Sequence, residues 1–109
     1  MAVYVDDARH ALGRMVMGHM LADTLEELHA MAAAIGLRRE WYQSNASFPH
    51  YDVNLQRRAH AVRLGAIQVN RRGIVQVKRR LQTDPAFIAE VRAACAAEQH
   101  GLPRFLRTE

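Results

Sequence analysis

The sequence is poor in the residues that indicate disulfides, structural zinc sites or membrane insertion. Its 109 residues include one cysteine and only 6% aromatic residues. A single cysteine excludes an intrachain disulfide and supplies too few thiolates for a structural zinc site. The sequence also has no basic leader followed by an apolar run, and no run long enough to span a bilayer. We therefore expect a cytoplasmic protein without a signal peptide or a membrane span.

The sequence also lacks a glycine-rich phosphate loop and a serine nucleophile motif. What it has in quantity is aliphatic side chains, since half of its residues are hydrophobic. A chain of this length and composition fits one compact domain with a real but small core. Because aromatic residues are few, aliphatic side chains and methionine must fill that core.

Positive charge is concentrated in the middle of the chain. The net charge is +4, and all but one of the fifteen basic residues are arginines. Residues 1–36 have a net charge of −3, residues 37–82 of +8, and the remainder of −1. So basic a middle third favours an anionic partner such as phosphate, nucleotide or nucleic acid. A solvated arginine-rich surface would explain the same composition.

Hydrophobic patterning predicts a small three-stranded sheet covered by about four helices, in an α/β or α+β single domain. Residues 1–82 form its compact part, and residues 83–109 add a final helix and tail packed on it. The predicted strands are 3–5, 15–21 and 66–69, with a polar loop over residues 9–14. The predicted helices begin near residues 24, 52, 72 and 85.

Helix-capping residues support two of these predictions. Asp23 precedes an apolar helical pattern and Glu26 follows three residues later, which is the capping-box arrangement, and Gly36 ends the pattern. Asp84 can cap the final helix, because Pro85 suits a first helical position.

The segment from Ser47 to Asp52 carries the densest chemistry of the chain. It places His50, Tyr51 and Asp52 after a proline, and two arginines, Arg57 and Arg58, follow. His50 would transfer a proton, Asp52 would orient it or cap the next helix, and the arginines and Tyr51 would hold an anion. The alternative is a capping aspartate, a surface histidine and an exposed basic helix.

Two further positions are candidates. Asp6 and Asp7 end the first strand, where open α/β sheets place ligands, and paired carboxylates suit a hard cation such as Mg²⁺. We assign Asp7 to the catalytic set as well. A solvated turn is the alternative. His19 interrupts the second apolar run, so it is a hydrogen-bonded core residue or a ligand-binding residue.

A second basic patch comprises Arg71, Arg72, Lys78, Arg79 and Arg80. Such patches bind nucleic-acid backbones. The alternative is a solvated helix surface, which we favour here. A further possibility is a homodimer in which the methionine-rich strand at residues 15–21 pairs across a two-fold axis.

Three segments resemble a known family. They are Val3-Tyr4-Val5-Asp6-Asp7, the stretch from Met20 to His29, and Phe48-Pro49-His50-Tyr51-Asp52 with the arginines that follow. Together they look like the small bacterial and phage proteins of domain of unknown function 4031, over about residues 2–82. The resemblance implies a small protein of that type with the last helix as an extension. It carries no activity.

These observations predict a polar pocket that binds a phosphorylated or otherwise anionic small molecule, with metal-dependent phosphoester hydrolysis or transfer as its chemistry. The alternative is a non-catalytic module that binds nucleic acid or an acidic partner. The first prediction requires that the Asp6–Asp7 pair and the His50–Asp52 segment meet in one pocket.

Overall fold

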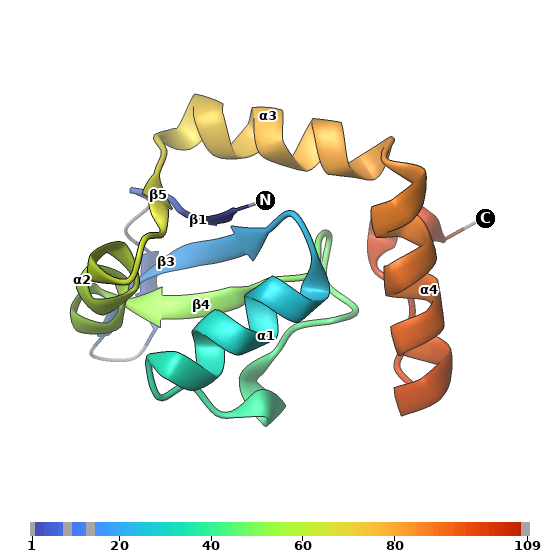
Figure 1. Ribbon diagram of the computed structural model, residues 1–109, viewed down its shortest axis with the longest axis horizontal. Coiled ribbons are helices and arrows are strands. Elements are labelled where there is room, and N and C mark those ends of the chain that lie inside the picture. Colours follow the sequence, from blue (N-terminus) through green and yellow to red (C-terminus); the bar gives the residue numbers. More distant parts are fainter. Residues whose placement is uncertain (1, 8–9, 13–14, 108–109) are drawn as a thin grey trace.

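A mixed β-sheet forms the centre of the molecule, with α1 packed on one face and the other helices arranged around it (Figure 1). The computed structural model describes residues 2–7, 10–12 and 15–107. The strand segments in these ranges are β1 (Val3–Val5), β2 (His10–Leu12), β3 (Met15–Ala22), β4 (Tyr51–Asn54) and β5 (Ile67–Gln68). The helices are α1 (Leu25–Ala34), α2 (Leu55–Arg63), α3 (Arg71–Gln82) and α4 (Pro85–Glu98), with 3-10 turns η1 (Arg39–Trp41) and η2 (Arg104–Leu106). The prediction of a mixed fold with four helices is confirmed.

The sheet is larger than the three strands predicted. Met20 of β3 pairs with Val5 of β1 on one side and with Tyr51 of β4 on the other, and both pairings are antiparallel. Met17 joins β2 and β4 in the same way. β1 and β2 therefore lie one after the other along the same side of β3, and β5 adds a parallel strand outside β1. The five segments occupy four positions across the sheet.

The strand β4 is the main correction to the sequence prediction, which began a helix at residue 52. The four residues of β4 alternate between buried (Tyr51, Val53) and half-buried (Asp52, Asn54), as a strand with one covered face does. The helix begins only at Leu55. Its N-cap is Asn54, which accepts a 2.8 Å hydrogen bond from the Arg57 amide, so the predicted capping role of Asp52 is wrong.

The predicted loop over residues 9–14 lies partly outside the described residues, which leave out 8–9 and 13–14. Between them, residues 10–12 form the strand β2. The proposed dimer contact through β3 is not available, because β3 already has strand partners on both sides. A homodimer formed in another way stays a prediction.

Apart from the start of α2, the helix ends lie close to where the sequence predicts them, and a different residue caps α1. Thr24, not Asp23, caps α1 by accepting from the Glu27 amide. The Asp23 carboxylate instead receives hydrogen bonds from the backbone of Ala2, from Tyr4 and from Arg80, so it ties β1 and α3 to the start of α1. The predicted stop at Gly36 is confirmed by a φ of +84°, which glycine adopts without a side-chain clash.

The C-terminal helix α4 is held against α1 by a carboxylate. Glu90 accepts hydrogen bonds from the backbone amides of Leu25 and Glu26, at 2.8 and 3.1 Å. These amides belong to the first turn of α1, where backbone amides have no carbonyl acceptor within the helix. The helix dipole also stabilises a negative charge at this end. None of the helices in the described ranges is both long enough and apolar enough to cross a bilayer.

On the face of the sheet under α1, His29 lies between two tyrosines. Its Nδ1 shares a 2.9 Å hydrogen bond with the hydroxyl of Tyr51, and its ring packs edge-on against Tyr42. Its Nε2 is buried and has no hydrogen-bond partner in the described structure. Burial, reinforced by the positive charge of Arg39, lowers the pKa of His29 to about 4.

This histidine should make stability depend on pH. Because the folded pKa is below the ordinary value of 6.5, the unfolded chain binds more protons between pH 6.5 and about 4, so stability is lost as the pH falls through that window. We expect a loss of about 1–3 kcal/mol, less than the full shift because the ring is only partly buried.

Urea unfolding at a series of pH values should show this slope in the wild-type protein. His29→Gln should remove it, whereas His100→Gln, at an exposed position, should keep it. An unchanged slope in the His29 variant would contradict the assignment.

Candidate metal centre

A row of polar residues crosses three neighbouring strands on the face of the sheet opposite α1. His19 of β3 pairs with Asp52 of β4. On its other side, Asp6 follows the paired residue Val5, and its amide donates to the His19 carbonyl at 3.1 Å. Residues opposite one another across strands point to the same face, so the three side chains lie together.

Asp6 holds the side chain of His19 in position. Its side chain is only 3% exposed, and both carboxylate oxygens face His19: Oδ1 accepts from the His19 amide at 2.9 Å, and Oδ2 lies 2.7 Å from His19 Nδ1. Arg58 holds the same residue through its backbone, because its Nε donates to the Asp6 carbonyl at 2.7 Å. A carboxylate partner puts the hydrogen of the imidazole on Nδ1 and directs Nε2 away from Asp6.

His50 is oriented in the same way by a different acceptor. Its Nδ1 lies 2.7 Å from the backbone carbonyl of Phe48. A carbonyl only accepts hydrogen bonds, so Nδ1 carries the hydrogen here as well. The Nε2 atom of His50 lies 3.3 Å from Oδ1 of Asp52, and the ring centroids of His19 and His50 are 5.4 Å apart.

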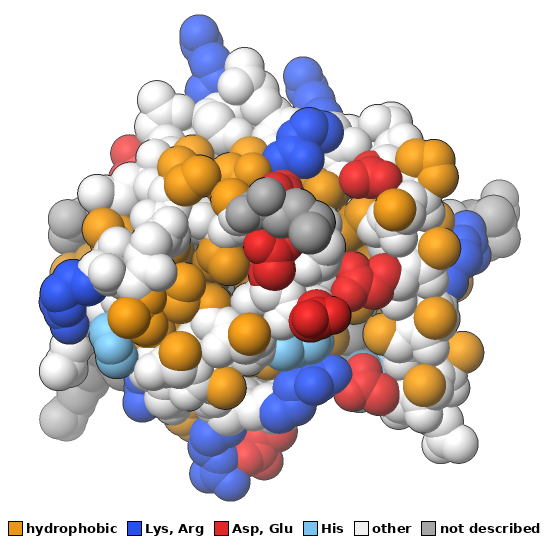
Figure 2. Space-filling model, viewed as in Figure 1, with side chains coloured by type: hydrophobic (Ala, Val, Ile, Leu, Met, Phe, Trp, Pro, Cys, Tyr) orange, Lys and Arg blue, Asp and Glu red, His pale blue; other side chains and the backbone are white. Residues whose placement is uncertain are grey.

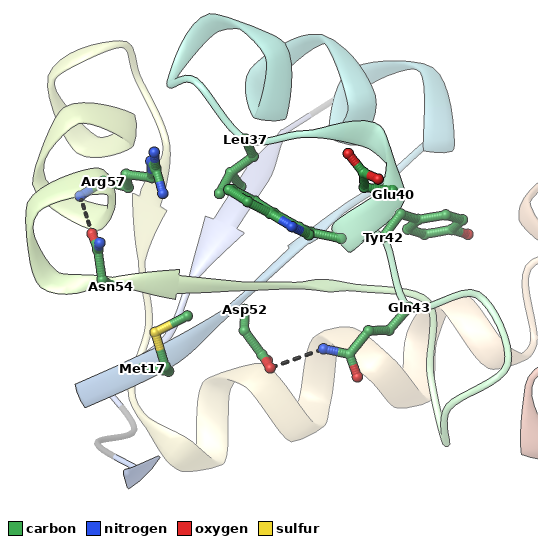
Figure 3. Close-up of a pocket in the computed structure, with 9 residues that line it drawn as sticks. Met17, Leu37, Glu40, Tyr42, Gln43, Asp52, Asn54 and Arg57 are labelled. Atoms are coloured by element: carbon green, nitrogen blue, oxygen red, sulfur yellow. Dashed lines mark hydrogen bonds between the residues drawn. The ribbon is translucent and has the colours of Figure 1, made fainter. Parts of the chain in front are cut away.

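Asp52 is an ionised carboxylate in this setting. The hydrogen bond with His50 lowers the pKa of Asp52, burial opposes this, and a hydrogen bond from Gln43 lowers the pKa further, so that the net shift is downward. The Gln43 amide donates to Oδ2 at 2.8 Å (Figure 3).

The pair formed by His50 and Asp52 can share a proton or a metal ion. When the single hydrogen of a neutral His50 is on Nδ1, Nε2 and the Asp52 carboxylate are both acceptors, and two acceptors 3.3 Å apart repel each other. A proton on Nε2 removes this repulsion, and so does a metal ion bound by both groups.

His19 completes a set of three metal-ligand side chains. One ligand atom each from His19, His50 and Asp52 lies within 4.8 Å of the other two. Around a tetrahedral zinc ion with bonds of about 2.1 Å, donor atoms are roughly 3.4 Å apart. The distance of 3.3 Å between His50 Nε2 and Asp52 Oδ1 already matches this value.

The structure brings some of the predicted site residues together and separates others. Asp6 meets the His50–Asp52 segment through His19, whereas Asp7 is exposed beside it. Tyr51 lies on the opposite face of the sheet, bonded to His29 and 1% exposed. Arg58 is occupied with backbone positioning. The predicted roles of these residues in catalysis or binding stay predictions.

A cavity of about 510 Å³ adjoins the row at the edge of β4. In Figure 3, Asp52, Gln43 and Met17 lie on one side of this strand, and Leu37, Glu40 and Arg57 lie on the side of α1. The cavity is lined by Met17, Leu37, Glu40, Trp41, Tyr42, Gln43, Asp52, Asn54 and Arg57.

Sequence reasoning missed Gln43 and the helix cap Asn54. Gln43 precedes Asp52 by nine residues in a loop-like stretch of the sequence. An isolated β-bridge between Gln43 and His50 brings it to the site. The alternation of Tyr51, Asp52, Val53 and Asn54 was the available signal for β4, but four residues are too few to outweigh a helical interpretation.

Comparison with known families identifies the family of this chain. A family model described as "Protein of unknown function (DUF4031)" matches residues 3–81. The chain belongs to this family. The match covers every residue of the polar row and stops at residue 81, one residue before the end of α3. The comparisons with curated proteins and with solved structures gave no match.

The two imidazole orientations can be measured directly. In nitrogen-15 spectra of the metal-free protein recorded above pH 8, we expect both His19 and His50 to carry their hydrogen on Nδ1. Asp6→Ala should abolish this preference for His19 and leave it intact for His50, because Phe48 supplies the acceptor for His50. Hydrogen on Nε2 of His50 in the wild-type protein would contradict the assignment.

Proposed function

We propose that this protein binds a divalent transition-metal ion through His19, His50 and Asp52 and uses it to hydrolyse a phosphoester. The observation that carries the proposal is the orientation of the two imidazoles: acceptors hold both Nδ1 atoms, so both Nε2 atoms are directed away from these acceptors, and that of His50 faces Asp52. Metal-binding histidines commonly have such a partner on the second ring nitrogen.

The donor set favours a particular class of ion. Two nitrogens and one carboxylate oxygen suit zinc, iron, manganese or nickel, whereas magnesium prefers six oxygens. Three protein ligands also leave positions for water and substrate, as in catalytic rather than structural sites. Asp6 would act behind His19 as an orienting carboxylate, in place of the ligand role expected from the sequence, and Asp7 would have no part in the site.

The chemistry that fits is hydrolysis. Water adds its oxygen to phosphorus, the bond between phosphorus and the ester oxygen breaks, and a proton from water passes to that leaving oxygen. The metal ion would lower the pKa of the attacking water and polarise the phosphoryl group. Arg57, which lines the adjoining cavity, would offset the negative charge of the phosphate.

A non-catalytic binding module is the second candidate, and α3 favours it. This helix carries five basic residues and no acidic one, and basic side chains project along its edge of the molecule (Figure 2). Arg80 is engaged by Asp23 and Tyr4. The remaining four residues have no ion pair in the described structure; they are Arg71, Arg72, Lys78 and Arg79.

Metal binding is the first test of the proposal. Calorimetric titration with zinc and manganese should show one ion per chain, and His50→Ala or Asp52→Ala should abolish it. Asp6→Asn should weaken affinity by about 10- to 100-fold, because His19 loses its orienting partner. Asp7→Asn is the matched control, since Asp7 is adjacent but exposed, and should keep wild-type affinity. Equal losses in the Asp6 and Asp7 variants would contradict the site.

Hydrolysis is the second test, with bis(para-nitrophenyl) phosphate as the probe. Release of nitrophenolate should require added metal, and His50→Ala should abolish it while circular dichroism shows an intact fold. Reversal of charge in an Arg72→Glu, Arg79→Glu double variant should leave this rate unchanged. If the double variant instead removes nucleic-acid binding from a protein that neither binds metal nor hydrolyses the probe, the binding module is the correct function.

A further inference from the structure

We propose that the cavity beside the metal centre recognises a nucleotide, with its base stacked on Trp41 and its phosphate held by Arg57. This inference rests on the proposed function for the phosphoester chemistry, but the recognition of the base does not depend on metal. The shared chemistry is that of a nucleoside phosphate, whether free or at the end of a single strand.

Trp41 provides the stacking surface. It is the only tryptophan of the chain, it lines the cavity, and it is 43% exposed although a hydrophobic side chain of its size is usually buried. The 3-10 turn η1 presents it next to Tyr42 and Gln43, which line the same cavity. Exposed aromatic rings are the platforms on which proteins stack bases.

Two guanidinium groups lie over this ring. The guanidinium of Arg57 is 5.4 Å from the Trp41 ring centroid, and that of Arg38 is 6.0 Å away. Arg38 forms an ion pair with Glu40, whereas Arg57 has no ion pair in the described structure. Arg57 is thus the guanidinium available to a phosphate next to a stacked base.

A second hollow extends the basic surface beyond Arg57. It has a volume of about 320 Å³ and shares Asn54 and Arg57 with the first. His60 and Arg63, from the later turns of α2, complete its basic lining. It is mostly polar, which suits a phosphate rather than an apolar group.

These features adjoin one another, so one nucleotide could contact both the ring and a phosphate site. Asp52, a proposed metal ligand, lies in the wall of the first cavity, Trp41 lines the same cavity, and Arg57 joins it to the basic hollow. A base on Trp41 would therefore have phosphate positions on both sides, toward the metal and toward Arg63. An acidic peptide without aromatic residues could use the arginines but would have no planar ring for Trp41.

The experiment uses Trp41 as its own reporter. Adenosine monophosphate, a short single-stranded oligonucleotide and ribose 5-phosphate are titrated into the metal-free protein while tryptophan fluorescence is recorded. We expect the two base-containing probes to quench the fluorescence to saturation and ribose 5-phosphate to bind at least about tenfold more weakly. Equal affinity for all three probes, or no binding of any, would overturn the proposal.

Variants then locate the binding by calorimetry. Trp41→Ala should weaken nucleotide affinity by roughly fivefold to a hundredfold, which corresponds to one base stack. Arg57→Ala should weaken it by roughly tenfold. Arg79→Ala, the matched control on α3, should have no effect, and a loss in this variant alone would overturn the proposal.

Two further comparisons separate the possible outcomes. Zinc calorimetry without nucleotide tests the metal centre, and base-dependent quenching of the metal-free protein tests nucleotide recognition, so failure of the metal centre and failure of nucleotide recognition are distinguishable. An oligonucleotide that binds more than about tenfold more tightly than the mononucleotide identifies a strand end as the ligand. Similar affinities identify a free nucleotide, and both results support the same recognition chemistry.

Discussion

Strand register places the carboxylate of Asp6, the imidazole of His19 and the carboxylate of Asp52 in one row across a sheet that is otherwise largely aliphatic. The proposed metal centre depends on that row. A shift of one residue in β3 would turn His19 to the opposite face, under α1, and bring Gly18 or Met20 opposite Asp6. The pairing of Met20 with β1 and β4 at once holds the register, because hydrogen bonds fix the strand on both sides.

Burial of the Asp6 carboxylate in this row costs free energy of folding, which suggests that the row has a function. A carboxylate that is 3% exposed loses most of its hydration, and the two hydrogen bonds to His19 offset that loss. An aliphatic residue at the position of Asp6 would pack without this cost. Buried polar groups that fix the direction of another side chain are typical of metal and catalytic sites, where the orientation of a donor atom decides affinity. The carbonyl of Phe48 orients the ring of His50 by accepting from its Nδ1, as the carboxylate of Asp6 does for His19.

The charges of the middle third have separate roles once the fold is known. Arg58 donates to the backbone carbonyl of Asp6, and Arg80 binds Asp23 and Tyr4, so both make contacts that hold the fold together. Arg57 and Arg63 line hollows beside the polar row. The basic residues of α3 form a different surface (Figure 2). The positive charge of the middle third therefore combines three groups of residues. Only the arginines that line the hollows bear on the proposed substrate.

The sequence by itself determined the elements whose signals are local. The first strand, α1, α3 and α4 follow from apolar spacing together with glycine stops and capping residues, all of which act within a few residues along the chain. Tertiary structure decided the rest. β4 is too short to be distinguished from a helix start, and only pairing with β3 makes it a strand. The meeting of Asp6, His19, His50 and Asp52 depends on hydrogen bonds between strands distant in sequence, and no local pattern encodes which residues will stand opposite one another.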